Sequence, residues 1–401
     1  MDRGLIALEV ENYRSLRRIN LPLTSLNVLV GPNGAGKSNL LEVFRFLSDM
    51  INTDLEPALD VRGGFDQVVF HGGLRDPSTI RIGLRATWST YSSATAPDQY
   101  DLRIERRKYK TRTSLSRRET FQFKRTQGRG RRISISGEGA TIVGIDSNRQ
   151  ESPERTLGIR RLSSGLSTLP RLSPEEGGAE VAALAERLAA FRVFDMSVAM
   201  ARRPSRFPRG TRETLEPDAS NLSAFLLALR EQDGELWDSL VDDAIEVLPQ
   251  LDDIDFDYPS GAAREVVLVL HERGMRTATQ LADASYGTIR LLGLLALLYD
   301  PDPPALTCVE EIDHGLHPQA LELLVERLRQ ASENSQFLIA THSPAFADRL
   351  KPEELIVCER RDDGSSAIPA LSTSQMLEIV EASENLPLGE LWFSGALGGD
   401  L

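Results

Sequence analysis

The stretch from Leu26 to Met50 constrains the fold more than any other part of the chain, because it combines a strand, a glycine-rich loop and a helix. Residues Leu26 to Val30 form a short apolar run that predicts a buried strand. The next residues, GPNGAGKS, match the phosphate-binding pattern G-x-x-x-x-G-K-[ST]. Apolar residues then recur with the spacing of an amphipathic helix, at Leu40, Val43, Phe44, Leu47 and Met50. A chance match would rarely fall in this context, so we predict a nucleotide-binding α/β core.

The residues of this loop offer the contacts that a nucleoside triphosphate needs. Its glycines let successive backbone N–H groups turn toward one anion, and the positive end of the following helix favours phosphate. Lys37 is expected to hold the β- and γ-phosphates of ATP, and the Ser38 hydroxyl is expected to ligate Mg²⁺. The predicted nucleotide contacts in the loop are Asn33, Gly34, Gly36, Lys37, Ser38 and Asn39.

An acidic pair, Glu310 and Glu311, follows the apolar run ALTCV. Beside a phosphate loop, one carboxylate can anchor the Mg²⁺ shell and the next can orient or deprotonate the attacking water. The alternative is two acids that begin a surface turn. His342 follows another predicted strand, Phe337 to Ala340, where a neutral imidazole could hydrogen-bond the γ-phosphate. A lone histidine is usually structural, but the spacing of His342 after the acidic pair favours the functional role.

Composition limits the classes of protein that the chain can represent. With 401 residues, 41% hydrophobic and 26% charged, it can bury a large core and is not a disordered chain. The N-terminus lacks the apolar segment of a signal peptide, and no apolar run is long enough to span a membrane. Two cysteines give neither a disulfide framework nor a metal cluster. We therefore expect a cytoplasmic protein with no membrane partner.

The segment from Asp101 to Arg132 is strongly basic although the whole chain carries a net charge of −13. Alternating stretches around Phe121 and Phe123 predict an antiparallel ribbon with cations on its exposed face. Such a ribbon could contact the phosphates of DNA or RNA; it could equally be a solvated ribbon, or one that pairs with acidic surface elsewhere. Its thirteen basic residues are Arg103, Arg106, Arg107, Lys108, Lys110, Arg112, Arg117, Arg118, Lys124, Arg125, Arg129, Arg131 and Arg132.

Periodicity divides the chain into three parts. Residues 1–150 open with a half-buried strand at Ile6, Leu8 and Val10 and contain the phosphate loop and the basic ribbon. Residues 151–262 are expected to hold a mobile Ser/Gly/Arg-rich segment and a helical insert. Residues 263–401 contain the remaining predicted strands and a helix, IRLLGLLALLY, that is apolar almost all round and so predicted to be buried.

Four motifs in this order resemble those of ABC-class ATPase heads of the RecF/SMC/OLD-like branch. They are the GPNGAGKSN loop, the SYGTIRLL signature, the CVEEIDHGLHP acidic strand and the IATHSP switch, and the resemblance covers roughly residues 5–75 and 175–400. It implies a P-loop NTPase fold with an antiparallel β lobe, a mixed central sheet and a helical insert. Only 59 residues follow His342, too few for the toprim nuclease domain of OLD proteins, and no heptads predict long coiled coils.

The resemblance also implies residue roles. Ser285 and Gly287 would touch the γ-phosphate of a nucleotide held by the opposite subunit. Glu311 would be the catalytic carboxylate, and Asp313 would lie in the dimer-contacting D-loop. Glu310 stands where aspartate is usual, and the signature begins Ala284-Ser285 rather than Leu-Ser. Two further assignments are weaker: Arg14 resembles a phosphate-clamping arginine but could be a surface residue, and Gln67 is a Q-loop candidate that could be a turn residue.

These observations predict an ATPase that forms a head-to-tail homodimer around ATP and Mg²⁺. Hydrolysis would be coupled to engagement of DNA or of a separate nuclease or effector chain, in DNA repair or anti-phage defence. The alternative is a nucleotide-gated scaffold that clamps a partner with little turnover. If nucleic acid does not bind the ribbon, the second predicted site is the group of arginines at Arg202, Arg203, Arg206 and Arg209.

Overall fold

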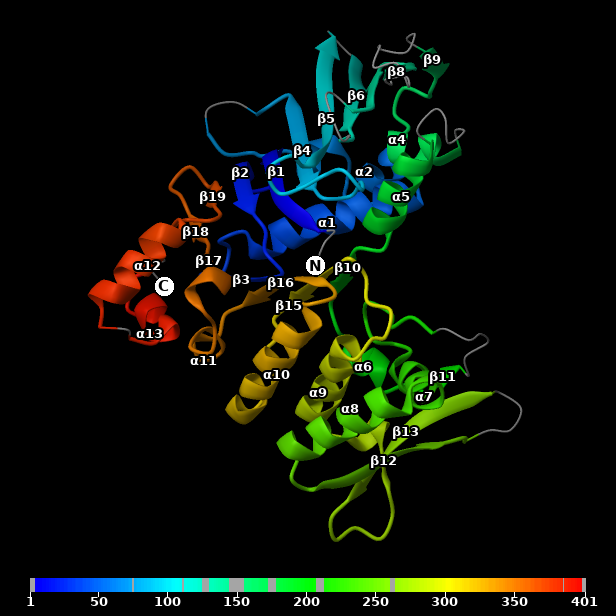
Figure 1. Cartoon of the computed structure of the whole chain (residues 1–401), viewed down its shortest axis with the longest axis vertical. Helices are drawn as coiled ribbons and strands as arrows, with labels where there is room; N and C mark the ends of the chain where they lie inside the picture. Colours follow the sequence, from blue (N-terminus) through cyan, green and yellow to red (C-terminus); the bar gives the residue numbers. More distant parts are fainter. Residues whose placement is uncertain are drawn as a thin grey trace.

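The computed structural model describes residues 4–73, 76–109, 112–124, 130–143, 155–171, 178–206, 213–259, 264–384 and 386–398. Figure 1 shows the order of its layers: an antiparallel sheet, the helix α1 (Lys37–Asn52), a parallel sheet, a layer of helices and a small second antiparallel sheet. The phosphate loop lies between the two larger sheets because it joins a strand of the parallel sheet to α1.

The parallel sheet positions the predicted site. Its strand order is β10-β15-β16-β3-β17, and every described pair is parallel. β3, β15 and β16 are buried almost throughout, as expected for parallel strands covered on both faces. The strands are β3 (Leu26–Val30), β10 (Arg192–Phe194), β15 (Leu306–Glu310), β16 (Gln336–Thr341) and β17 (Leu355–Val357).

Each face of this sheet belongs to a different hydrophobic core. Leu29 and Leu338 point into the core shared with α1 and the large antiparallel sheet. Their neighbours Val28 and Ile339 point into the core shared with the helices on the other side. This alternation follows from the two-residue period of a strand. The parallel sheet is therefore the layer that separates the two hydrophobic cores and packs against both.

The large antiparallel sheet has the order β2-β1-β4-β5-β6-β7-β8-β9. The fold class is confirmed, and this sheet is the predicted antiparallel β lobe. The central sheet was predicted to be mixed, but its described strand pairs are all parallel. Parts of the Ser/Gly/Arg-rich stretch form ordered strands; residues 144–154 and 172–177 are outside the described chain. The strands are β1 (Leu5–Tyr13), β2 (Leu16–Pro22), β4 (Thr79–Ala86), β5 (Asp98–Tyr109), β6 (Arg112–Gln122), β7 (Arg132–Ser136), β8 (Gly139–Val143) and β9 (Arg155–Gly158).

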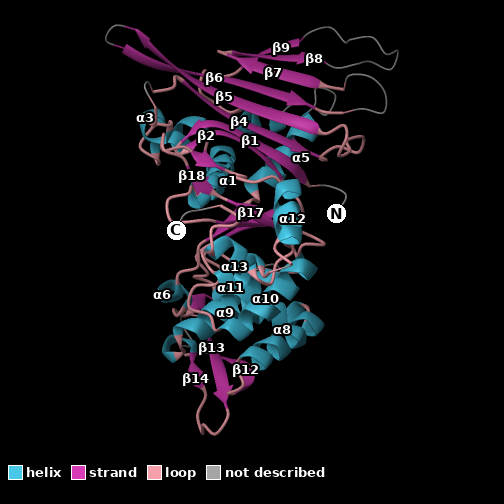
Figure 2. Ribbon diagram, turned by 90° about the vertical axis from the view of Figure 1, so that its left-hand side faces the viewer, coloured by secondary structure: helices cyan, strands magenta, loops and turns pink. Residues whose placement is uncertain are grey.

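The helices predicted as one insert are divided between the two cores. The apolar face of α5 (Gly178–Ala189), with Val181 and Leu184, packs in the core of α1. In contrast, α7 (Leu222–Gln232) and α8 (Gly234–Val247) pack with the apolar helix α9 (Tyr286–Leu298) in the other core. Figure 2 shows α8 and α9 between the parallel sheet and the small sheet at the opposite end. The small sheet comprises β11 (Ser205–Arg206), β12 (Leu251–Asp257), β13 (Glu265–Glu272) and β14 (Thr279–Gln280).

The remaining elements are short, apart from α10 and α12, and surround the two cores. Within the described residues, no helix is both long and apolar enough to cross a membrane. The elements are α2 (Leu55–Asp60), α3 (Phe65–Val68), α4 (Gly165–Thr168), α6 (Val198–Ala201), α10 (Pro318–Ala331), α11 (Pro344–Ala347), α12 (Thr373–Ala382), α13 (Leu388–Phe393), β18 (Glu359–Arg360) and β19 (Ser366–Ala367).

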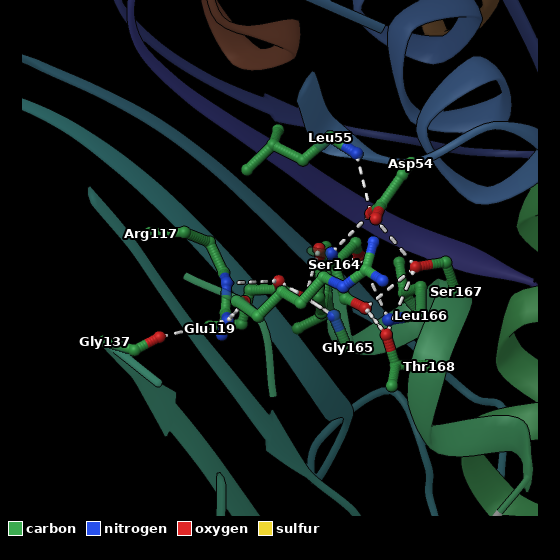
Figure 3. A network of polar contacts seen from close by, with 12 residues as sticks. Asp54, Leu55, Arg117, Glu119, Gly137, Ser164, Gly165, Leu166, Ser167 and Thr168 are labelled. Atoms are coloured by element: carbon green, nitrogen blue, oxygen red, sulfur yellow. Dashed lines mark hydrogen bonds and ion pairs between the residues drawn. The ribbon is translucent and has the colours of Figure 1, made fainter. Parts of the chain in front are cut away.

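A buried ion pair fastens the antiparallel sheet to α4 (Figure 3). Arg117 and Glu119 lie on β6 with no side-chain exposure, and Arg117 Nε is 3.5 Å from Glu119 Oε1. Glu119 also accepts hydrogen bonds from the Gly165 amide at 2.9 Å and from the Tyr100 hydroxyl at 3.2 Å. Burial raises the pKa of Glu119 to about 6. The prediction that the ribbon carries Arg117 on an exposed face is therefore wrong.

We expect Glu119→Ala to lower the free energy of unfolding by about 3–5 kcal/mol, because it leaves the Arg117 charge buried without its partner. Urea denaturation followed by circular dichroism measures this loss. Glu105→Ala is the matched control, since Glu105 pairs with Arg107, whose side chain is 65% exposed, and such surface pairs contribute about 0–1 kcal/mol. Equal losses in the two variants would contradict a structural role for the buried pair.

Candidate functional site

The phosphate loop requires glycine at Gly36 because the chain packs against it closely. Gly36 has φ 103°, in the left-handed region, and an added Cβ would lie 2.1 Å from Ser366 Oγ. The Ser366 hydroxyl is in turn 2.7 Å from the Ser15 hydroxyl, which accepts a hydrogen bond from Asn39 Nδ2 at 2.8 Å. The loop is thus supported by segments from both ends of the chain, while Asn33 and Gly34 remain exposed at its tip.

Lys37 lies with its ammonium group inside the loop. Its Nζ donates to the carbonyl oxygens of Gly31 at 2.6 Å and Pro32 at 3.1 Å, and only 5% of the residue is exposed. Burial lowers the pKa of Lys37 to about 8. His342 Nδ1 lies 3.4 Å from Lys37 Nζ, and partial burial together with this ammonium lowers the pKa of His342. The structure therefore joins the loop and the switch, with His342 favoured in its neutral form.

Ser38 and Glu310 face each other across the end of the parallel sheet. The Ser38 hydroxyl donates to Glu310 Oε2 at 2.9 Å. Hydroxyl and carboxylate oxygens are ligands that Mg²⁺ accepts, with phosphate oxygens and water completing an octahedral shell. The two predicted metal ligands therefore fit a Mg²⁺ ion. Glu310 ends β15, whereas Ser38 lies at the start of α1, which follows β3, and β15 and β3 are two positions apart in the parallel sheet.

Glu311 begins the turn after β15 in a left-handed conformation, with φ 47°. Its Oε2 lies 3.2 Å from His314 Nδ1, and both side chains are more than half exposed. From α9, the 5% exposed Arg290 donates through Nη2 to the carbonyl oxygens of Glu310 at 3.2 Å and Glu311 at 2.5 Å. The backbone of the acidic pair is therefore held by the helix that carries the signature.

The signature packs on the same turn. Ser285 caps α9 by accepting from the Thr288 amide at 3.1 Å. An added Cβ on Gly287 would lie 2.7 Å from the Gly315 carbonyl oxygen, and the rings of Tyr286 and His314 are 5.6 Å apart. The signature and the turn after β15 are thus packed directly against each other.

The switch is tied to this turn through Asp313, which accepts a hydrogen bond from the Thr341 hydroxyl. The Ser343 amide donates to the same hydroxyl at 3.0 Å. Asp313 therefore connects the turn after β15 to the segment that carries His342.

A polar cavity of about 560 Å³ lies beside the phosphate loop. Arg14 lines it and donates to Asn39 Oδ1 at 3.5 Å, and Gln67 from α3 lines it as well. Arg360 also lines it and donates to the Gly34 carbonyl oxygen at 2.9 Å. The cavity is large enough for the nucleoside part of a nucleotide. The roles of Arg14 and Gln67 stay predictions.

Several residues of the site were not predicted. Arg290 could have been predicted from the sequence, because an arginine within an apolar helix needs polar partners when it is buried. Arg360, Ser366 and His314 could not, because their positions depend on how distant segments of the chain fold back onto the loop and the turn.

A protein-family model described as "AAA domain, putative AbiEii toxin, Type IV TA system" matches residues 26–348, from β3 to the segment after the switch. The chain belongs to this family. The match contains the phosphate loop, the signature, the acidic pair and His342, which is the order of motifs found in the sequence.

Other similarities agree with this membership of the AAA-domain family. An OLD nuclease of Thermus scotoductus (strain ATCC 700910 / SA-01) is 38% identical over 73 residues, which is 15% of this chain and 14% of that relative. An SMC head bound to the C-winged helix domain of ScpA is 12% identical, with a TM-score of 0.54 over 94% of this chain and 99% of that chain. An Smc head with an extended coiled coil, from a complex with the C-terminal domain of ScpA derived from Pyrococcus furiosus, is 13% identical, with a TM-score of 0.53 over 95% and 100% of the two chains. The predicted SMC/OLD-type ATPase fold is confirmed.

The lowered pKa of Lys37 predicts that ATP affinity depends on pH. The phosphates of ATP attract the protonated form of Lys37. Below pH of about 8, Lys37 is already protonated in the nucleotide-free protein, so ATP binding requires no proton uptake. Above that pH the amine of the nucleotide-free protein is neutral, and we expect Kd to rise by up to tenfold per pH unit. Isothermal titration calorimetry between pH 7 and pH of about 9.5 measures this change.

Circular dichroism over the same pH range controls for alkaline unfolding, and Lys37→Ala provides the second control. The Lys37 ammonium contacts carbonyl oxygens of the loop and His342, and the residue belongs to neither hydrophobic core, so the variant is expected to fold normally and lose ATP binding. A Kd that stays constant across the pH range, or ATP binding that survives Lys37→Ala, would contradict the role assigned to Lys37.

Proposed function

We propose that the protein is an ATP-hydrolysing enzyme whose active sites form between two subunits arranged head to tail. The observation that carries this proposal is the 2.9 Å contact between Ser38 and Glu310 beside the buried Lys37. It brings the phosphate-binding residues and the metal-binding residues to one edge of the parallel sheet, with the second carboxylate, Glu311, adjacent in sequence. ATP and Mg²⁺ are the ligands proposed for this site.

The chain's own residues would act mainly by orientation and charge. Lys37 and the loop amides neutralise the β- and γ-phosphates, while Mg²⁺, held by Ser38 and Glu310, adds further positive charge when it is bound. Glu311 would orient the attacking water and accept its proton. His342, favoured as neutral imidazole, would donate a hydrogen bond to a γ-phosphate oxygen. Phosphoryl transfer requires this kind of positioning more than covalent catalysis.

The signature supports a shared site. Ser285 is exposed at the N-terminus of α9, a buried helix of 13 residues whose free amides suit an anion. The signature packs on the turn after β15 through Gly287, whereas the nucleotide of the same subunit would lie on the loop after β3. We therefore propose that Ser285 and Gly287 contact the γ-phosphate held by a second subunit, so that ATP stabilises the dimer.

Hydrolysis would be coupled to engagement of DNA or of a separate effector chain. The family description names a toxin–antitoxin system, and the partial relative is called a nuclease, which favours anti-phage defence or DNA repair as the setting. The solved heads that resemble this chain bind ScpA domains, which illustrates that this fold carries protein partners.

The structure narrows the proposed nucleic-acid surface on the basic ribbon. Arg106 pairs with Asp66 and Arg131 with Glu180, and both arginine side chains are less than a quarter exposed. The exposed cations of the ribbon are Arg103, Arg107, Arg118 and Arg132. Lys110, Arg125 and Arg129 lie outside the described residues, as do the side chains of Lys108 and Arg112. The alternative basic group is tied to the signature, since Arg202 donates to the Ala284 carbonyl oxygen at 3.0 Å; Arg209 lies outside the described chain.

A second candidate function is a nucleotide-gated scaffold with little turnover. The contact of Glu311 with His314 favours it, because this carboxylate must leave a partner before it can activate water. Steady-state phosphate release by the wild-type protein separates the two candidates.

For the enzyme, we expect Glu311→Gln to retain ATP binding, to lose most turnover and to accumulate as an ATP-bound dimer. The amide keeps the size of the carboxylate but cannot accept the proton of water. A phosphate-release assay and light scattering coupled to gel filtration measure turnover and mass. Wild-type phosphate release by Glu311→Gln would refute the role of this residue.

Ser285→Asp in the Glu311→Gln background is the matched test of the interface. Aspartate is as good an N-cap as serine, so α9 should stay intact, but its charge repels a γ-phosphate. We expect this variant to bind ATP as a monomer, whereas Ser285→Thr should still dimerise. ATP-dependent dimers in both variants would place the interface elsewhere.

A further inference from the structure

A second cavity, of about 470 Å³, lies at the end of the large antiparallel sheet. It is formed by the loop after β4, by residues that follow β6 and precede β7, and by one side of α5. It shares no lining residue with the cavity beside the phosphate loop. Nothing in the proposed ATPase cycle uses it. Its volume falls within the range of small-molecule sites.

Buried Asp98 holds the backbone segments that line this cavity. Asp98 is fully buried, and its carboxylate accepts hydrogen bonds from three amides, those of Trp88 at 3.1 Å, Ser89 at 2.6 Å and Lys124 at 2.6 Å. The Ser89 hydroxyl adds a fourth at 3.0 Å. One carboxylate therefore fixes the backbone that carries an aromatic and a cationic side chain of the lining, so the cavity is held in shape without a ligand.

The lining combines aromatic and charged groups. Trp88, Tyr91 and Phe123 contribute rings, and Tyr91 is 54% exposed although it is a large hydrophobic residue. The charged lining residues are three basic ones, Lys124, Arg131 and Arg187, and one acidic one, Glu180. Aromatic faces next to cations are the combination with which proteins bind a nucleobase and its phosphate.

Glu180 gives the cavity a feature that points to a ligand with a hydrogen-bond donor. Its Oε1 accepts from Arg131 Nη1 at 2.7 Å, which orients the carboxylate. Its Oε2 is shielded from solvent and, in the described structure, accepts no hydrogen bond. Buried acceptors of this kind usually have a partner. Because the Glu180 side chain as a whole is 37% exposed, a rotation of its carboxylate would turn Oε2 toward the cavity, where a donor on a bound molecule would remove the cost of the missing partner.

We propose that this cavity binds a nucleotide unit whose base carries an exocyclic amino group. The base stacks on the ring of Trp88 or Tyr91, its amino group donates to the Glu180 carboxylate, and its phosphate lies near Lys124 and Arg131. The same chemistry is present in a free mononucleotide and in one residue of a single strand of DNA or RNA. The site is separate from the phosphate loop and does not depend on ATP hydrolysis.

Intrinsic fluorescence tests this proposal, because Trp88 is partly exposed whereas Trp237 and Trp392 are 7% and 2% exposed. The titrations use the full chain carrying Lys37→Ala, which removes nucleotide binding at the phosphate loop. The ligands are AMP, UMP and short single strands of deoxyadenosine or thymidine, since uracil and thymine lack the exocyclic amino group. We expect AMP or the deoxyadenosine strand to quench the fluorescence saturably, and uracil or thymine ligands to bind more weakly.

Three substitutions identify the site. Trp88→Phe should remove the quenching, Lys124→Glu should raise Kd about tenfold or more because it reverses a charge-assisted contact, and Glu180→Gln should reduce the preference for adenine. Arg273→Glu is the control for charge reversal, since Arg273 is 67% exposed in the opposite lobe. Tighter binding of AMP identifies a free nucleotide as the ligand, and tighter binding of the strand identifies a single-stranded nucleic acid.

Two results would overturn the proposal. The first is no saturable response to any of the four ligands while circular dichroism reports a folded protein. The second is a response that survives Trp88→Phe or is unchanged by both Lys124→Glu and Glu180→Gln, because it would then arise at another site. Either result leaves the proposed ATPase untouched, since that activity is tested at Lys37 and Glu311.

Discussion

Parallel pairing of β15, β16 and β3 is the constraint on which the rest of the structure depends. Their register places Glu310 beside Ala340 and Thr341 beside Val30, so three segments distant in sequence end at one edge of the sheet. Because these strands are buried on both faces, a one-residue slip would exchange the side chains of two hydrophobic cores. Hydrophobic packing therefore sets the distance between Ser38 and Glu310, and with it the geometry of the proposed magnesium site.

The same sheet separates the residues that would bind a nucleotide from those that would act on a neighbouring one. The phosphate loop is supported from the core of α1 and the large antiparallel sheet, whereas the signature belongs to the core on the opposite face. Two residues connect the signature with the nucleotide-binding edge of the sheet. Arg290 of α9 donates a hydrogen bond to the backbone of the acidic pair, and Asp313 accepts one from Thr341, next to the switch residue His342. A second subunit that pressed on the signature would therefore act directly on the turn that carries Glu311.

The sequence predicted the parts of this arrangement that local chemistry determines. The strand Leu26–Val30 has the predicted bounds, and α1 follows the loop as its apolar spacing requires. Periodicity could not tell which core a helix joins, so α5 was grouped with α7 and α8 although it packs on α1. Charge counting likewise could not separate exposed Arg103 from buried Arg117. Both lie on strands of alternating character and each pairs with an acid two residues away, so only the face of the sheet on which each lies distinguishes them. Contacts made by distant segments, such as that of Arg360 with the phosphate loop, had no local signal.

The central claim is that each active site takes its phosphate loop from one subunit and its signature from the other. Mixing two inactive variants, Lys37→Ala and Ser285→Asp, tests it most directly. A heterodimer of the two contains one site with an intact loop and an intact signature, so an equal mixture should recover about a quarter of the wild-type rate of phosphate release. A mixture no more active than the two variants measured separately would contradict a shared site and would assign catalysis to the single subunit.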